Sequence, residues 1–137
     1  MSSNVTKNVS PLRYPGGKTR AIHILEKYIN TYYPNKKTII SPFFGGGSFE
    51  LHMKSKGYTI IANDLFTPLY TFWTMKQTHC DAVIEKIKEK MPITKELFHI
   101  LRNSIVSEPD LVEKAASYFI LNRCSFSGAT LCGGFSK

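Results

Sequence analysis

Long apolar runs, paired cysteines and a signal peptide are all missing from this sequence of 137 residues. No stretch approaches the ~20 apolar residues of a transmembrane helix, so we expect no membrane partner. The first residues also lack the apolar core that directs secretion. The three cysteines, Cys80, Cys124 and Cys132, form no C-x-x-C pair, which is typical of reduced thiols in a soluble intracellular protein. The histidines do not cluster at metal-ligand spacing, so no metal is expected.

Acidic residues are scarce in the first 48 residues, where Glu26 stands alone against seven lysines and arginines. The remainder is nearly balanced, with eleven basic residues against nine acidic ones, and the net charge of the whole chain is +8. A concentrated positive field favours a polyanionic partner, most often nucleic acid. Charge by itself does not decide the question, because many basic domains bind no nucleic acid.

Hydrophobic periodicity predicts one helix and then two strands separated by a glycine-rich loop. A helix is expected from Lys18 until Pro34, because apolar residues recur there at helical spacing. The recurring positions are Ile22, Leu25, Ile29 and Tyr32. Apolar, β-branched runs at residues 37–41 and 58–63 predict buried strands. Between them, a short helix is expected to be capped by Ser48 and terminated by Gly57.

The remainder of the sequence is predicted to be helical until a tail rich in glycine and serine. Thr67 and Pro68 provide an N-cap and a first-turn proline, and further helices are expected to begin near Asp81, Thr94 and Asp110. The chain therefore contains one βαβ unit embedded in helices. Because two parallel strands are too few for an independent sheet, we expect the N-terminal part of a larger α/β domain.

The loop at residues 43–47 directly follows the first predicted strand and contains three consecutive glycines. Ligands of βαβ units bind at the carboxyl ends of the strands, and glycine lets the backbone approach a ligand closely. Asp64 ends the second strand, 19 residues after Gly45, where a carboxylate can accept hydrogen bonds from both ribose hydroxyls. A nucleoside-containing cofactor fits both features. The alternative is that the loop is only a tight turn.

Two common phosphate-binding motifs do not fit the sequence. The dinucleotide motif G-x-G-x-x-G fails because its last position falls on Glu50. The segment GGKT at residues 16–19 resembles the end of a P-loop, but the earlier glycine would fall on Leu12 and no strand precedes it. A cofactor with adenosine and no phosphate remains, and S-adenosylmethionine is the common one.

Four segments, taken in order, resemble the adenine-N6 DNA methyltransferases of the Dam type, the D12 class. They are PLRYPGGKTR (11–20), PFFGGGSFEL (42–51), ANDL (62–65) and YFILNRCSFSG (118–128). The resemblance implies an α/β, Rossmann-like S-adenosylmethionine-dependent methyltransferase fold that is incomplete and carries a helical insertion after the second strand. It also implies a cofactor-binding half at 11–66, a helical segment at 67–123 and the start of a target-recognition region at 124–137.

The resemblance also implies roles for individual residues. Those expected to contact S-adenosylmethionine are Tyr14, Lys18, Phe43, Gly45, Gly46, Gly47 and Asp64. Alternatives stay open for three of them: a solvated Lys18, a Phe43 packed in the core, and an Asp64 that caps the next helix. Those expected to contact DNA phosphates are Arg123, Ser125 and Ser127. Arg123 can instead interact with the dipole of its own helix.

The catalytic motif of this family, D/N/S-P-P-Y/F/W, has no counterpart here, since no two of the seven prolines are adjacent. In such enzymes the adenine is flipped out of the duplex, and this motif orients the lone pair of its N6 amino group. We therefore expect a truncated, site-specific DNA methyltransferase that is inactive alone. The substrate of the whole enzyme would be double-stranded DNA in the cytoplasm of a prokaryotic or virus-infected cell. Its partners would be a missing C-terminal half or a companion restriction enzyme of a restriction-modification system.

Two alternative functions to a truncated DNA methyltransferase are also considered. The first is a non-enzymatic basic DNA-binding or regulatory remnant, for which the net charge of +8 speaks. The second is a methyltransferase of the same broad fold that acts on RNA or protein. The YPGGK element at residues 14–18 argues against the latter, because the resemblance at that element is to the adenine-N6 DNA group.

Overall fold

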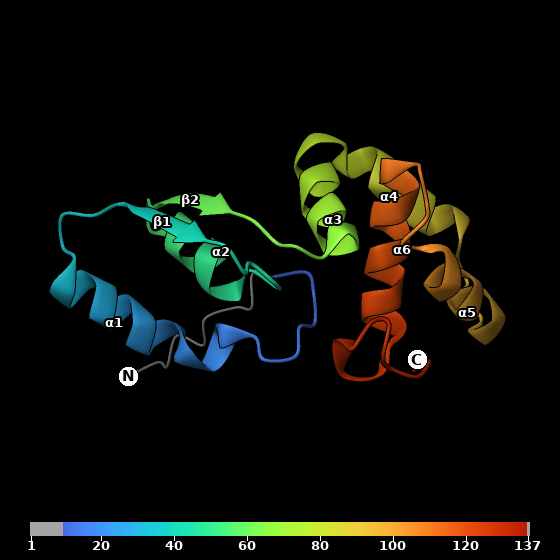
Figure 1. Cartoon of the computed structure of the whole chain (residues 1–137), viewed down its shortest axis with the longest axis horizontal. Coiled ribbons are helices and arrows are strands. Elements are labelled where there is room, and N and C mark those ends of the chain that lie inside the picture. The colour runs from blue at the N-terminus through green and yellow to red at the C-terminus, as the bar shows by residue number, and fades with distance from the viewer. Residues whose placement is uncertain (1–9, 137) are drawn as a thin grey trace. The chain divides into compact units, whose positions relative to one another are not determined.

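The computed structural model describes residues 10–136, which divide into two compact units (Figure 1). Within this range, residues 10–11 and 16–63 form unit 1, and residues 12–15 and 64–136 form unit 2. The short segment 12–15 therefore belongs to unit 2, although the residues on both sides of it in the sequence belong to unit 1. Each unit is built around its own set of buried side chains.

Unit 1 is a βαβ unit preceded by a helix. In chain order its elements are the 3₁₀ helix η1 (Lys18–Ala21), α1 (Ile22–Tyr32), β1 (Thr38–Ser41), α2 (Ser48–Ser55) and β2 (Thr59–Ala62). The two strands are parallel and pair in register, with Ile39 opposite Ile60 and Ile40 opposite Ile61. Pro34 follows the end of α1, and Gly57 follows α2 with φ of 88°, the left-handed conformation that terminates a helix. The predicted order of helix, strand, helix and strand is confirmed. The expectation that both strands are buried is wrong, because Ser41 is the one strand residue that is buried.

The core of unit 1 lies on one face of its two-stranded sheet. Figure 1 shows α1 and α2 on the same side of the strands. The buried residues Ile22, Phe49, Met53 and Tyr58 form a cluster there, and Leu25, Ile29, Ile39 and Ile60 pack against it. The next residue along each strand points to the opposite face, as the period of a strand requires. On that face Ile40 and Ile61 stay 72% and 55% exposed.

Unit 2 is a helical assembly in which α6 is the central element. Its helices are α3 (Thr67–Thr78), α4 (Cys80–Glu89), α5 (Lys95–Ser104) and α6 (Leu111–Cys124), followed by the 3₁₀ turn η2 (Phe126–Gly128). α6 packs against α3, α4 and α5 (Figure 1). Ala115 and Ala116 on α6 are completely buried. Their small side chains let the neighbouring helices approach α6 closely.

Side-chain caps fix the beginnings of two helices in unit 2. Thr94 Oγ1 accepts a hydrogen bond from Leu97 N at 3.1 Å at the start of α5. Asp110 Oδ1 accepts one from Glu113 N at 2.7 Å at the start of α6. Each oxygen satisfies one of the backbone N–H groups that a helix start leaves unpaired. Both helix starts were predicted from the sequence, and both are confirmed.

The α/β order expected from the sequence is confirmed for a small parallel sheet and the helices around it. A larger Rossmann-like sheet is not formed by residues 10–136, which contain only β1 and β2 as named strands. The tail from residue 124 onward lies in the same unit as α3 to α6. Among the helices described, none has the length and apolar character needed to cross a membrane.

Candidate cofactor site

The glycine loop leaves the carboxyl end of β1 and is tied to the end of β2. Phe44 N donates a hydrogen bond to Asn63 O at 3.0 Å, and Gly47 N donates one to Phe44 O at 3.0 Å. Ser10 Oγ reaches the carbonyl oxygen of Gly46. All three glycines of the loop are buried. The loop therefore occupies the edge of the sheet where βαβ units bind their ligands.

Gly47 is required by the packing of the loop itself. Its φ is +65°, a conformation that residues with a side chain rarely adopt. A Cβ atom at this position would lie 2.5 Å from the ring of Phe44, which is inside van der Waals contact. The tight-turn interpretation thus accounts for Gly47, and any close approach of a ligand is left to its neighbours Gly45 and Gly46.

The two phenylalanines before the glycines have opposite environments. Phe44 is buried, whereas Phe43 is 81% exposed. The alternative that Phe43 packs in the core is therefore wrong, and Phe44 does so instead. An exposed ring beside the loop stays available to a ligand.

Glu50 is a buried acid that sequence analysis did not select as a site residue. It lies in the first turn of α2, and its Oε1 accepts a hydrogen bond from Ser41 Oγ at 2.7 Å. This contact joins the end of β1 to the helix that follows the glycine loop. The signal in the sequence was an acid within an otherwise apolar stretch directly after the glycines.

The expected cofactor residues are divided between the two units. Lys18 and Phe43 belong to unit 1 together with the three glycines, while Tyr14 and Asp64 belong to unit 2. Lys18 is exposed at the start of η1, as both a ligand contact and a solvated lysine would be. In unit 2 the charge of Asp64 acts on Tyr14, and in unit 1 Phe43 and the three glycines share one loop. The two groups are described separately.

Asp64 forms a turn just before α3 and does not cap that helix. Its Oδ1 accepts a hydrogen bond from Phe66 N at 3.1 Å. The N-cap position of α3 is Phe66, which makes no side-chain capping bond. The capping alternative is thus replaced by a local turn that holds the carboxylate two residues after the end of β2.

Tyr14 lines a cavity of about 310 Å³ that lies entirely within unit 2. Three aromatic residues, Tyr14, Phe66 and Tyr118, line it together with Pro15 and residues 128–132. Phe66 and Tyr118 contact each other edge to face, with ring centroids 6.1 Å apart. A pocket with such walls suits a flat, mostly apolar ring. Only Tyr14 among these residues was expected from the sequence.

Asn122 holds the segment that carries Tyr14. This asparagine is completely buried. Its Oδ1 accepts a hydrogen bond from Arg13 N at 2.9 Å, and its Nδ2 donates to Arg13 O at 2.6 Å. Nδ2 also lies 3.3 Å from Gly128 O, to which it donates. The side-chain amide therefore satisfies both backbone groups of Arg13, one residue before Tyr14.

Gly128 allows this contact because it has no side chain. Its φ is +71°, and a Cβ atom would lie 2.3 Å from Arg13 O. Asn122 and Gly128 together form a backbone clamp for residues 12–15, and we call this arrangement the Arg13 clamp. No local sequence pattern predicts this clamp, because its two segments lie far apart in the chain.

Burial changes the acidity of both tyrosines in the cavity wall. The pKa of Tyr118 is raised above its ordinary value, because burial disfavours the phenolate. Partial burial also raises the pKa of Tyr14, and the negative charge of Asp64 adds to this. Both phenols are consequently neutral hydrogen-bonding groups at physiological pH.

The three residues expected to contact DNA differ in accessibility. Arg123 and Ser127 are exposed. Ser125 is 1% exposed, and its hydroxyl accepts a hydrogen bond from Thr130 N at 2.8 Å and lies 3.3 Å from Asn122 O. We therefore remove Ser125 from the candidate phosphate contacts, because an internally bonded, buried hydroxyl cannot reach a phosphate. Arg123 lies in the last turn of α6, where the interaction with the helix dipole also applies.

Metal binding finds no support among the side chains of residues 10–136, where no group of three or more His, Cys, Asp or Glu residues could hold an ion. The three cysteines are free thiols.

Unit 1 has a glycine loop at the carboxyl end of a parallel strand, the position where α/β proteins bind their ligands, and unit 2 has its own cavity. Residues 14–134 match the family described as D12 class N6 adenine-specific DNA methyltransferase, and the chain belongs to this family. Two curated relatives, from two strains of Vibrio cholerae serotype O1, are each named DNA adenine methylase. Each is 25% identical over 133 residues, which cover 91% of this chain and 45% of the relative. The chain thus spans less than half the length of these relatives.

Proposed function

We propose that this chain provides the S-adenosylmethionine-binding half of an enzyme that methylates N6 of adenine in double-stranded DNA. The observation that carries the proposal is the buried glycine loop at the carboxyl end of a parallel βαβ unit, within a chain of the D12 family. The proposal extends to the location, since such an enzyme acts inside the cell that holds its DNA.

The side chains present fit the chemistry of this cofactor. The loop offers backbone groups and glycines, and its sequence is not a phosphate-binding motif. Asp64 offers a carboxylate for ribose hydroxyls. Tyr14 and the exposed Phe43 offer aromatic surfaces, and Lys18 offers a cation for the cofactor's carboxylate. When bound, the cofactor supplies an activated methyl group.

The proposal leaves the methyl-transfer step to residues outside this sequence. A D-P-P-Y type motif is needed to orient the adenine amino group, and the 137 residues contain no adjacent prolines. We therefore expect the chain alone to bind the cofactor without methylating DNA. A complementing segment or partner chain that carries the motif is required for activity.

A calorimetric titration of S-adenosylmethionine into the purified chain tests the proposal. We expect binding, and we expect Asp64→Ala to weaken it by at least about tenfold, since two charge-assisted hydrogen bonds are lost. Asp81→Ala is the matched control, because it removes an exposed aspartate of α4 outside the candidate site. Absence of binding by a folded chain would contradict the proposal.

A second function, that of a non-enzymatic DNA-binding remnant, is favoured by the net charge of +8. It predicts that the folded chain binds duplex DNA while S-adenosylmethionine has no effect on it. Measuring duplex affinity with and without the cofactor in the same preparation separates the two functions.

A further inference from the structure

Three tyrosines at the end of α1 form an exposed aromatic surface on unit 1. Tyr28, Tyr32 and Tyr33 are 54%, 64% and 51% exposed. The centroid of the Tyr28 ring lies 4.5 Å from that of Tyr32 and 6.4 Å from that of Tyr33. Three large rings gathered on one exposed surface are more than the scattered single apolar side chains of an ordinary surface.

Lysines accompany the tyrosines, and acids do not. Lys27 precedes Tyr28, and Lys36 N donates a hydrogen bond to Tyr33 O at 3.0 Å, which keeps Lys36 next to the third tyrosine. Lys37 follows and lies over the ring of Tyr58 at 4.5 Å. No Asp or Glu occurs from residue 27 to residue 49. The local charge is therefore positive and uncompensated along this part of the chain.

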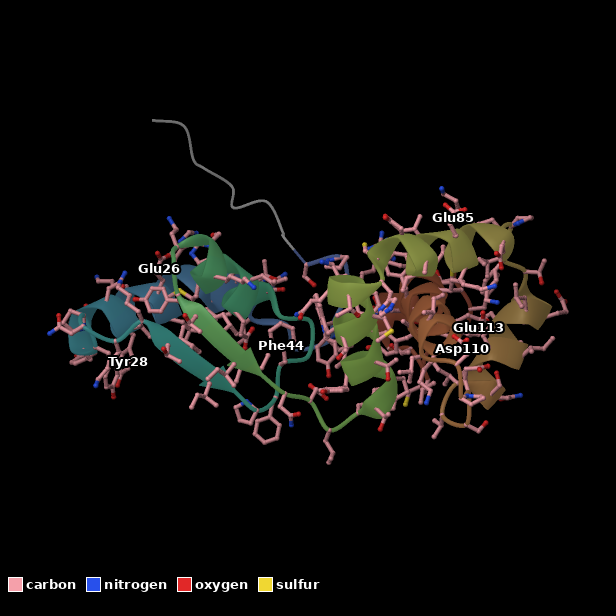
Figure 2. All side chains as sticks on the ribbon, turned by 90° about the horizontal axis from the view of Figure 1, so that it is seen from above. Glu26, Tyr28, Phe44, Glu85, Asp110 and Glu113 are labelled. Atoms are coloured by element: carbon pink, nitrogen blue, oxygen red, sulfur yellow. The ribbon has the colours of Figure 1, made fainter. Side chains whose placement is uncertain are left out.

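Glu26, the acidic residue nearest to the tyrosines in the sequence, pairs with a histidine of α2. Glu26 Oε2 lies 2.7 Å from His52 Nε2 on α2. Glu26 and Tyr28 are two positions apart on α1, and Figure 2 shows their side chains on different sides of the helix. The carboxylate thus leaves the positive charge beside the tyrosines intact.

A surface that binds single-stranded nucleic acid needs two components, exposed aromatic rings and nearby lysines. The faces of the bases stack on aromatic rings, and lysines pair with the phosphates between them. A duplex hides the faces of its bases, so the tyrosines would add little to duplex binding. The absence of local acids argues against a basic protein partner as the occupant.

We propose that Tyr28, Tyr32 and Tyr33, together with Lys27 and Lys36, bind single-stranded nucleic acid. This site goes beyond the proposed function, which concerns a cofactor and duplex DNA, and it does not depend on it. We call these five residues the tyrosine surface.

Fluorescence anisotropy of a labelled oligothymidylate with the full chain tests the tyrosine surface. Tyr28→Ser/Tyr32→Ser is expected to weaken binding by about tenfold or more, from the loss of two stacking rings. Tyr28→Phe/Tyr32→Phe keeps the rings and is expected to retain the affinity. Duplex binding should be the same in all three proteins.

The salt dependence of the same titration tests the lysines. Lys27→Gln/Lys36→Gln is expected to reduce the slope of log K against log salt by about 1.4, since each phosphate contact to a single strand contributes about 0.7. The matched control is Lys54→Gln/Lys95→Gln, which removes two exposed lysines outside the surface and should leave the slope almost unchanged.

Two results would overturn the proposal. One is unchanged oligothymidylate affinity in the serine variant, with a circular dichroism spectrum that matches the parent chain. The other is an equal loss of slope in both lysine variants, which would mean that net charge alone attracts the oligonucleotide. Neither result bears on the calorimetric test of cofactor binding, so the two proposals fail independently.

Discussion

Unit 2 surrounds its central helix with other helices, whereas unit 1 covers only one face of its sheet. α6 contacts three helices, and eight of its residues are buried, from Lys114 to Asn122. In unit 1, α1 and α2 cover Ile39 and Ile60 but leave Ile40 and Ile61 open. Parallel strands normally have cover on both faces. The helices of unit 2 therefore cover one another, while one face of the sheet in unit 1 stays exposed.

The largest effect is expected from breaking the Arg13 clamp in unit 2. Gly128→Ala places a Cβ atom 2.3 Å from Arg13 O and keeps a residue with a side chain at φ of +71°. We expect unit 2 to lose about 3 kcal/mol of unfolding free energy, from left-handed backbone strain and overpacking. Urea unfolding monitored by the fluorescence of Trp73, the single tryptophan, measures this. Gly134→Ala is the control, since nothing lies within 4 Å of its Cβ position, and an equal loss in both variants would contradict the prediction.

A smaller effect is expected from a cavity in the core of unit 1. Met53 is completely buried in that core, and Met53→Ala should cost about 2 kcal/mol, at the low end for such truncations because the open sheet can relax. Amide hydrogen exchange should rise in β1, β2 and α2. The Trp73 unfolding curve should stay in place if the units unfold separately. A shift of that curve would instead mean that the two units unfold together.

Alkaline pH is expected to act on unit 2 through its buried tyrosine. The pKa of Tyr118 is raised above its ordinary value of 10.0 by burial, so the unfolded chain loses this proton first as pH rises. Stability is therefore unchanged below pH 10 and falls above it by up to about 1.4 kcal/mol per pH unit for this group. Urea unfolding at a series of pH values tests this. Tyr118→Phe should remove most of the dependence, and an unchanged slope in that variant would assign it to other groups.

The smallest effect is expected on the open face of the sheet. Ile40→Thr/Ile61→Thr replaces two exposed side chains with β-branched residues and should change stability by less than about 0.5 kcal/mol. The same exchange on the covered face, Ile39→Thr/Ile60→Thr, should cost about 2 kcal/mol, because it places hydroxyls against the core. Hydrogen exchange of β1 and β2 separates the two variants. Similar losses in both would mean that the open face is packed in solution.

The elements of the fold were predictable because each depends on local patterns. Thr94 and Asp110 mark helix starts by the side-chain bonds they make, and both predictions are confirmed. Two other starts were displaced by one residue. Ser48 is the first residue of α2, not its cap, because the left-handed Gly47 occupies the cap position. Thr67 is likewise the first residue of α3 and follows Phe66 as cap.

The environment of single side chains was harder to predict than the elements. Phe43 and Phe44 are neighbours in a loop, where no periodicity tells which ring is buried. Tyr32 continues the apolar spacing of α1, yet it is exposed. It is the last residue of the helix and is not part of the buried cluster of unit 1. Burial of Ser125 and Asn122 depends on contacts with the tail and with Arg13, which no local pattern contains.

The Arg13 clamp also sets the order in which parts of the protein can form during synthesis. Arg13 and Asn122 are separated by 109 positions in the sequence, and Gly128 comes later still. Loop closure over such a distance carries a substantial entropic cost, and it cannot begin until the second partner exists. A nascent chain that has completed the glycine loop of unit 1 still lacks the contacts that hold Tyr14. During synthesis on the ribosome, residues 12–15 are therefore among the last to reach their final position.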